Sequence, residues 1–312
     1  MSKPEQLARE EFEAFVTNPG LGELASLFGL AELPKDTHEK LASLEELAAT
    51  HWDFRNGVER QAVNWNDELL DQEGSEQWKI IFKAAGKLGL VDGSEPMNKR
   101  PRTLAILGGA NKSPLDRLRY GISVIDDLDL LVYLGSSRQI DTDLEREKIA
   151  DYAEGAKTEF DLGSRALEGF LAAEQIYETY ATYDDDTWGV RQYDIELNGS
   201  KKPAFALSTP RTIGAQRATT YDNFRTFADN ATGLADYSLD NLASVVSVTN
   251  AFYTAGQHLP GVQELTLPHG TQLETVGFSA DYVGMTRKPR QLLQETKSAI
   301  DAAVRLEAAL AA

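Results

Sequence analysis

The fold is decided by the stretch Thr103-Leu104-Ala105-Ile106-Leu107-Gly108-Gly109-Ala110-Asn111-Lys112-Ser113-Pro114. Its first five residues form a short apolar run, which is typical of a strand buried on both faces of a sheet. Two glycines follow. Ser113 and Pro114 then favour a helix start, because serine caps helix N-termini and proline suits the first helical turn. A buried strand that leads directly into a helix indicates an α/β domain.

Further apolar runs follow along the chain and alternate with helical patterns. We predict further strands at 129–134, 203–207, 244–249 and 262–267. We predict helices at 114–125, 143–154, 163–181, 216–231, 251–257 and 289–311. Because strands alternate with helices, the predicted fold class over residues 98–312 is α/β with a mainly parallel sheet flanked by helices.

The residues before this domain show only helical patterns. From Glu5 to about Leu90 apolar residues recur at helical spacing, and sequences such as Asn18-Pro19-Gly20 mark the breaks between helices. We predict four or five helices, which form an N-terminal all-helical region over residues 1–97.

The composition of the 312 residues excludes several kinds of protein. The chain has no cysteine, which removes disulfides, thiol nucleophiles and cysteine-ligated metals. Its net charge of −18 repels phosphate backbones, so general nucleic-acid binding is not expected. No window approaches the roughly 20 apolar residues of a membrane span, and residues 1–11 lack the apolar stretch of a signal peptide. We therefore expect a cytoplasmic protein that does not contact membranes.

Candidate binding residues follow the predicted strands, because parallel sheets bind ligands at the carboxyl ends of their strands. Glycines before a helix start let backbone amides approach an anion, and hydroxyl and guanidinium groups are natural partners of phosphate or carboxylate. A tight strand-to-helix turn is the alternative for the first loop, and a helix cap is the alternative at Thr219 or Thr220. The candidates are Gly108, Gly109, Asn111, Arg117, Gly135, Ser136, Ser137, Arg138, Arg211, Arg217, Thr220, Asn223, Thr249 and Asn250.

Local charge favours an anionic ligand at these loops. Residues 99–119 and 199–225 together hold eleven basic residues and two acids, a net charge of +9 in a chain that is otherwise strongly acidic. A positive cleft in a negative protein attracts a small anion. The alternative is a pair of solvated basic loops that balance acidic neighbours.

Four residues are candidates for acid–base chemistry: the carboxylates Glu159 and Asp161, then Asp222, and the imidazole of His269. His269 follows the last predicted strand, where an imidazole can act as acid or base. The carboxylates stand early in helical segments, where the alternative role is to complement the helix dipole. The acidic turn 183–186 is better explained by solvation than by a metal, and no metal site is predicted. Walker A, G-x-G-x-x-G and G-x-S-x-G motifs are absent.

The order of these motifs resembles that of the YdcF/SanA/ElyC-like family over residues 103–270. The similar elements are Leu107-Gly108-Gly109 with Arg117, then Gly135-Ser136-Ser137, Glu159, Thr220-Tyr221-Asp222-Asn223 and Val248-Thr249-Asn250. Two departures stand out: the second glycine motif is Gly-Ser-Ser, and the histidine expected after the fourth strand is missing near Phe252 and Tyr253. The resemblance implies a Rossmann-like fold with a small-molecule site at the strand ends. It also suggests a nucleotide or S-adenosylmethionine as ligand. Many members are membrane-anchored, whereas the helical region takes the place of an anchor here.

The sequence therefore predicts binding of a small anionic, nucleotide-like metabolite, with hydrolase or transferase chemistry left open. The alternative is a non-catalytic module that senses a ligand or docks a protein partner through its N-terminal helices.

Overall fold

The computed structural model describes residues 1–55, 63–65, 67, 70–140, 142–183, 186–230, 238–284 and 286–312. Asp184 and Asp185 of the acidic turn lie outside these residues. The chain divides into two compact units. The first comprises Met1–Ser94, Asn250–Gln263 and Gly277–Ala312, and the second comprises Glu95–Thr249 and Glu264–Val276.

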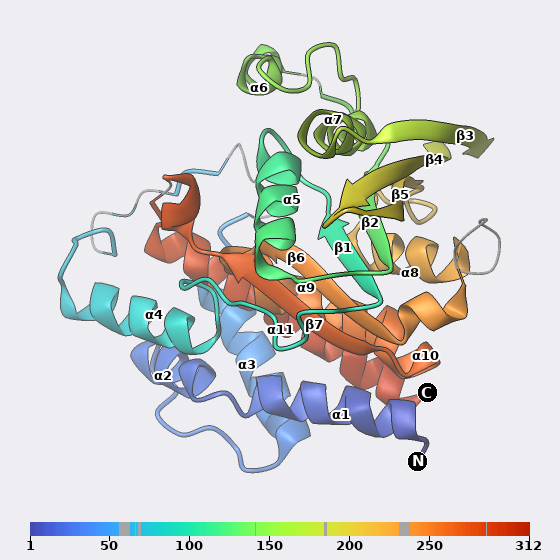
Figure 1. Cartoon of the computed structure of the whole chain (residues 1–312). Coiled ribbons are helices and arrows are strands. Elements are labelled where there is room, and N and C mark those ends of the chain that lie inside the picture. The colour runs from blue at the N-terminus through green and yellow to red at the C-terminus, as the bar shows by residue number, and fades with distance from the viewer. Residues whose placement is uncertain are drawn as a thin grey trace. The chain divides into compact units, whose positions relative to one another are not determined.

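A seven-stranded sheet has the order β3-β4-β5-β2-β1-β6-β7 (Figure 1). Its strands are β1 Thr103–Leu107, β2 Leu130–Ser136, β3 Glu174–Tyr183, β4 Asp186–Leu197, β5 Ser200–Thr209, β6 Ser244–Asn250 and β7 Gln272–Phe278. Strand β1 pairs in parallel with β2 and β6, and β2 pairs in parallel with β5. The β3–β4 and β4–β5 pairs are antiparallel. The α/β class with a mostly parallel sheet is confirmed.

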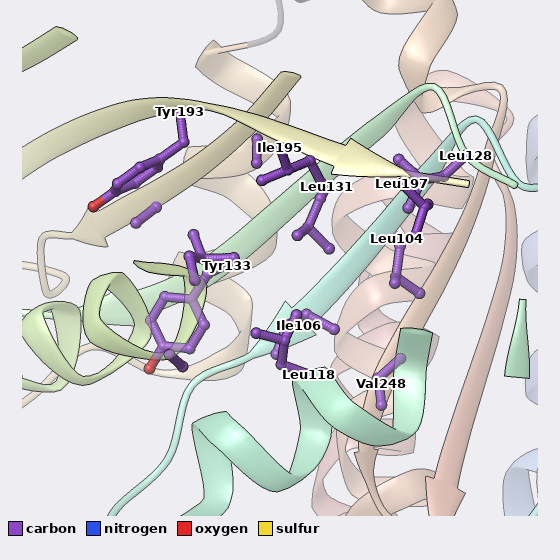
Figure 2. Packing of buried hydrophobic residues seen from close by; sticks show 14 of the residues in the cluster. Leu104, Ile106, Leu118, Leu128, Leu131, Tyr133, Tyr193, Ile195, Leu197 and Val248 are labelled. Atoms are coloured by element: carbon purple, nitrogen blue, oxygen red, sulfur yellow. The ribbon is translucent and has the colours of Figure 1, made fainter. Parts of the chain in front are cut away.

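Helices cover both faces of this sheet in the second unit. Helices α5 and α7 pack against β1 and β2, while α8 packs against β2 and β5 from the opposite face (Figure 1). The core beneath α5 and α7 includes Leu104, Ile106, Leu131 and Tyr133 (Figure 2). The helical elements of this unit are α5 Ser113–Val124, α6 Asp143–Ile149, α7 Glu159–Leu171, α8 Thr220–Asn230, η2 Leu239–Leu242 and α10 Leu267–His269.

The first unit is helical, as the sequence predicts for its N-terminal part. Its helices are α1 Lys3–Val16, α2 Pro19–Leu27, α3 Thr37–His51, α4 Glu76–Lys87, η3 Ala251–Tyr253, α9 Thr254–Gly261, η5 Ala280–Val283 and α11 Pro289–Ala311. Side-chain caps at Ser2, Asn18, Asp36 and Ser75 start α1, α2, α3 and α4, because each satisfies a backbone N–H that lacks a partner within its helix.

The division of the chain into these two units differs from the single boundary predicted at residue 97. The first break falls close by, between Ser94 and Glu95, but α9 and α11 belong with the N-terminal helices. Helix α11 packs against α1, α3, α4 and α9 and buries residues such as Leu292 and Ile300. Its periodicity indicates a buried face, but periodicity does not reveal which part of the chain covers that face.

Two predicted elements are wrong. The run 262–267 is a π-helical segment, Val262–Thr266, that continues α9, and the last strand is β7 at Gln272–Phe278. The helix predicted at 163–181 ends at Leu171 with Ala172 in the left-handed region, and Glu174–Tyr183 is strand β3. A short apolar run fits a buried strand and a buried helix equally well, so periodicity alone did not separate them.

Candidate functional site

Gly108 forms a close turn at the carboxyl end of β1. Its N–H donates to the Leu134 carbonyl at 2.7 Å, which extends the β1–β2 pairing by one residue. A Cβ atom on Gly108 would lie 2.7 Å from that carbonyl oxygen and 3.1 Å from Cδ of Glu159. Because no other residue lacks this atom, glycine alone lets the Glu159 carboxylate approach the turn so closely.

The Glu159 carboxylate lies at the start of α7 and faces the end of β2. The Thr158 hydroxyl caps the helix, and Asp161 completes the capping box from the third helical position. Glu159 is therefore not used in the cap. Its Oε2 instead accepts a hydrogen bond from Oγ of Ser136 at 2.5 Å, and Ser136 is buried. The predicted candidates Gly108, Ser136 and Glu159 thus meet.

Tyr133 fastens α7 to the sheet beneath this contact. Its hydroxyl donates to the Glu159 carbonyl at 3.0 Å, and its ring packs so tightly against Gly163 that a Cβ there would lie 2.0 Å from the ring. Burial raises the pKa of Tyr133 well above its ordinary value, and the nearby Glu159 charge raises it further. Tyr133 therefore remains a neutral hydrogen-bond donor.

Arg117 shapes the turn between β1 and α5. The side chain is buried, and its Nη1 donates to the carbonyls of Leu107 and Gly108. A Cβ on Gly109 would lie 3.3 Å from the same Nη1. The guanidinium thus supports the candidate loop through its backbone.

Arg138 lies beside the Ser136–Glu159 contact. Its N–H donates to Oγ of Ser136 at 3.3 Å, and its carbonyl accepts from the N–H of Glu159 at 2.9 Å. Its Nη1 donates to the buried Glu145 at 3.2 Å. The adjacent Ser137 is half-buried. The Glu145 carboxylate on α6 thus holds the Arg138 side chain at the strand ends.

Asp222 has a capping role at α8. Its carboxylate accepts hydrogen bonds from Oγ1 of Thr212 at 2.5 Å and from N and Oγ1 of Thr219 at 2.8 and 2.7 Å. The N–H of Asp222 donates in return to Oγ1 of Thr219. This is a capping box. Because it occupies both carboxylate oxygens, the structure does not favour Asp222 as a catalytic acid or base.

The loop after β5 lies beside the end of β2, because Thr209 and Ser136 are register partners. Arg211 donates to the Gln216 carbonyl at 3.4 Å, Arg217 is exposed, and Thr220 and Asn223 are half-buried at the start of α8. This loop and the Ser136–Glu159 contact thus share the same edge of the sheet.

Four buried polar atoms at these strand ends have no hydrogen-bond partner among the described residues. They are Asn111 Oδ1, Arg138 Nη2, Thr209 Oγ1 and Asn223 Oδ1. Buried polar groups are almost always paired, and an unpaired one costs about 1–3 kcal/mol. Asn111 also has a φ of 55°, in the left-handed region. The unpaired atoms come from the loops after β1 and β2, from the end of β5 and from α8.

His269 lies on the side of the sheet opposite to the carboxyl ends of the strands. It ends α10 and precedes β7, so its predicted position after the last strand is wrong. The N–H of Gln272 donates to the Ala243 carbonyl, and Ser247 bonds Thr275, so β7 begins beside the beginning of β6. His269 therefore lies at the amino ends of the strands, away from Glu159.

Thr249 and Asn250 end β6, next to β1 in the sheet. Thr249 is fully buried. Asn250 accepts the N–H of Phe252 at 3.1 Å and so caps η3, and it belongs to the first unit. The structure gives Asn250 a local capping role.

The positive charges of residues 99–119 and 199–225 are largely balanced by acids from other segments. At least six of their eleven basic side chains form ion pairs, which include Lys99–Glu95, Arg102–Asp129, Lys112–Asp151, Lys201–Asp194, Lys202–Asp127 and Arg225–Glu264. For these six, the alternative of basic loops that balance acidic neighbours describes the structure.

Sequence reasoning named Asp161 only as a candidate carboxylate and missed Tyr133 and Thr209. The Thr158-x-x-Asp161 spacing is a capping-box signal and places the helix start at Glu159 instead of residue 163. The role of Tyr133 depends on its contact with Gly163, for which the sequence has no local signal. Thr209 ends β5 beside Ser136, which only strand order reveals.

In the part of the chain that the structure describes, no three His, Cys, Asp or Glu residues are grouped to hold a metal ion. None of the described helices is long and apolar enough to cross a membrane.

Comparisons with known proteins show that the chain is similar in sequence to mycobacterial proteins. Residues 2–89 match the family described as the Rv3785 N-terminal domain. The chain is 28% identical over 324 residues to two uncharacterized proteins, Rv3785 of Mycobacterium tuberculosis and Mb3814 of Mycobacterium bovis. The similarity covers 95% of this chain and 88% of each relative, so it extends over both units. No solved structure matches the chain.

Proposed function

We propose that the second unit binds a small anionic, nucleotide-like metabolite at the carboxyl ends of β1, β2 and β5. The observation that carries the proposal is the set of four unpaired polar atoms on Asn111, Arg138, Thr209 and Asn223. Two are side-chain amide oxygens, one is a hydroxyl and one is a guanidinium nitrogen. A ligand that has both an anionic group and hydrogen-bond donors would satisfy all four.

The surroundings of these atoms support the same ligand class. Gly108 lets the Glu159 carboxylate lie close to the first loop, since a Cβ there would lie 3.1 Å from Cδ of Glu159. Arg138 supplies a guanidinium whose Nη1 pairs with Glu145 and whose Nη2 has no hydrogen-bond partner among the described residues. The resemblance of these motifs to the YdcF/SanA/ElyC-like family adds support for a nucleotide or S-adenosylmethionine.

Glu159 is the acid–base candidate that the structure leaves at this edge. Asp161 and Asp222 are engaged in capping boxes, and His269 lies at the other edge. The Glu159 carboxylate accepts from the Ser136 hydroxyl at 2.5 Å, which is the geometry of a base beside a hydroxyl nucleophile. We propose binding as the primary function, with Glu159 and Ser136 as the pair that any hydrolase or transferase step uses.

Ligand binding is tested by mass spectrometry of small molecules that co-purify, followed by thermal shifts with nucleotides, sugar phosphates and S-adenosylmethionine. A ligand at about 100 times its Kd stabilises the native state by about 2.7 kcal/mol. For a protein of this size that corresponds to a Tm rise of roughly 4 °C.

Arg138→Ala and Asn223→Ala should each remove most of this Tm rise, because each deletes one unpaired polar group. The matched control is Arg165→Ala, which removes an exposed arginine paired with Glu168 on α7 and should leave the rise unchanged. The proposal fails if no ligand at millimolar concentration shifts Tm, or if both site variants respond like the wild type.

A further inference from the structure

A hollow of about 730 Å³ lies in the second unit beside Arg138. Residues from 139–140, from α6 and its C-cap, and from 154–157 line it. Its size falls within the roughly 300–1,000 Å³ of sites for small organic molecules. None of the predicted site residues lines it.

The lining of this hollow is apolar at the bottom and balanced in charge at the rim. Ile140 and Ile149 are buried and belong to a small apolar cluster with Leu162. The exposed lining of the hollow includes two cations, Arg146 and Lys157, and two acids, Glu147 and Glu154. Because the charges of these described lining residues cancel, the hollow favours an uncharged group, and the apolar floor favours a flat ring whose polar edges reach the rim.

Two short segments connect the hollow to the strand-end atoms. Residues 136–140 and 156–159 run side by side, held by hydrogen bonds from Glu159 N–H to the Arg138 carbonyl at 2.9 Å and from Ile140 N–H to the Lys157 carbonyl at 2.8 Å. Gln139 and Thr158 form an antiparallel bridge between these two bonds. Ser136 and Glu159 lie at one end, and Ile140 and Ala156 lie at the other. Three to four residues of extended chain separate the ends by about 10 Å.

We propose that this hollow binds the uncharged ring of a ligand whose anionic group lies at the strand ends near Arg138. The ligand class is an anion linked to a heterocycle, with a length of about 10 Å between the two parts, as in a nucleotide. The inference rests on the proposed function and adds where the second part of the ligand binds. Arg138 lies between the two parts, because Gln139 and Ile140 line the hollow and the Arg138 N–H bonds Ser136.

The test fills the hollow with a tryptophan side chain and measures the binding of two probes by titration calorimetry. Ala150→Trp places an indole in the hollow from the C-cap of α6, where the native side chain is exposed. Leu144→Trp is the matched control, because Leu144 is on the same helix, is 59% exposed and does not line the hollow. The probes are ADP, which has a ring, and inorganic pyrophosphate, which has none.

We expect Ala150→Trp to weaken ADP binding at least tenfold while pyrophosphate binding stays within twofold of the wild type. Leu144→Trp should leave both affinities unchanged. If the variant binds both probes equally more weakly, or binds both as tightly as the wild type does, the inference is overturned and the proposed function stands. A wild-type protein that binds neither probe would contradict the proposed function itself.

Hydrogen exchange on the wild type gives a second measurement that does not depend on how a variant folds. ADP should slow amide exchange in 139–157 beyond the effect of pyrophosphate at equal saturation, because only ADP has a group for the hollow. Identical protection by the two probes would overturn the inference.

Discussion

Helices α7 and α8 both begin at the carboxyl edge of the sheet with a capping box, yet their carboxylates have different roles. In α8, Asp222 is the residue that completes the box, and Thr212 and Thr219 occupy its oxygens. In α7, Asp161 completes the box, and Glu159, two residues earlier, is left to bond Ser136.

The comparison teaches that a carboxylate early in a helix is assigned by its position relative to the N-cap. At the third helical position it folds back onto the cap, because it can reach the backbone N–H of the capping residue. At the first position it cannot make this bond and points toward the preceding strand ends. Three predictions test this contrast.

The largest effect is expected where α7 contacts the sheet. Gly163→Ala places a Cβ 2.0 Å from the Tyr133 ring, so α7 must move away from β2 and take Glu159 with it. We expect a loss of about 3 kcal/mol in the free energy of unfolding, measured by urea denaturation. Gly169→Ala on the same helix meets no atom within 4 Å and should stabilise by up to about 1 kcal/mol. Equal effects of the two variants would show that the Tyr133 contact does not fix α7.

An intermediate effect is expected at the two carboxylates. Asp222→Ala should cost about 1–2 kcal/mol in the free energy of unfolding, because it removes the cap of α8, and should leave ligand binding within threefold of the wild type.

Glu159→Gln should change the free energy of unfolding by less than about 0.5 kcal/mol, because no cap is lost. It should abolish any turnover or weaken ligand binding at least tenfold. Ligand binding is measured by calorimetry and stability by denaturation. The contrast would be contradicted if Asp222→Ala lost ligand binding and Glu159→Gln lost stability.

The smallest effect is expected in the acid range. Burial raises the pKa of Asp161, but hydrogen bonds from Lys157 and Thr158 and the Arg191 charge outweigh it and lower the pKa below the ordinary 3.8. A lowered pKa in the native state contributes stability that is present above the unfolded-state pKa and is lost as the pH falls through the native value.

The stability of the wild type should therefore decline more steeply below about pH 4 than that of Asp161→Asn, by less than about 1 kcal/mol. Other carboxylates with lowered pKa values, such as Glu178, contribute to both proteins, so the measurement is the difference between the two unfolding curves. Parallel curves from pH 5 to pH 2 would show that the Asp161 charge is not needed for the cap.

The sequence predicted the elements that depend on neighbouring residues. The strands at 103–107 and 244–249 and the helix at 289–311 match β1, β6 and α11 closely, because their apolar patterns have distinct lengths and marked ends. The prediction failed at 262–267 and 174–183, where several interpretations fit the local pattern. In the candidate site it found Gly108, Ser136 and Glu159, since each ends a strand or starts a helix.

The amino-acid order by itself determined the α/β class, the helical N-terminal region and the loops that carry polar groups, because these follow from local periodicity and turn chemistry. Only the tertiary structure decided that Glu159 meets Ser136, that Asp222 is a cap, that His269 lies at the far edge, and that α11 packs with the N-terminal helices. Each of these outcomes depends on strand order and on contacts between residues far apart in the chain, which local patterns do not encode.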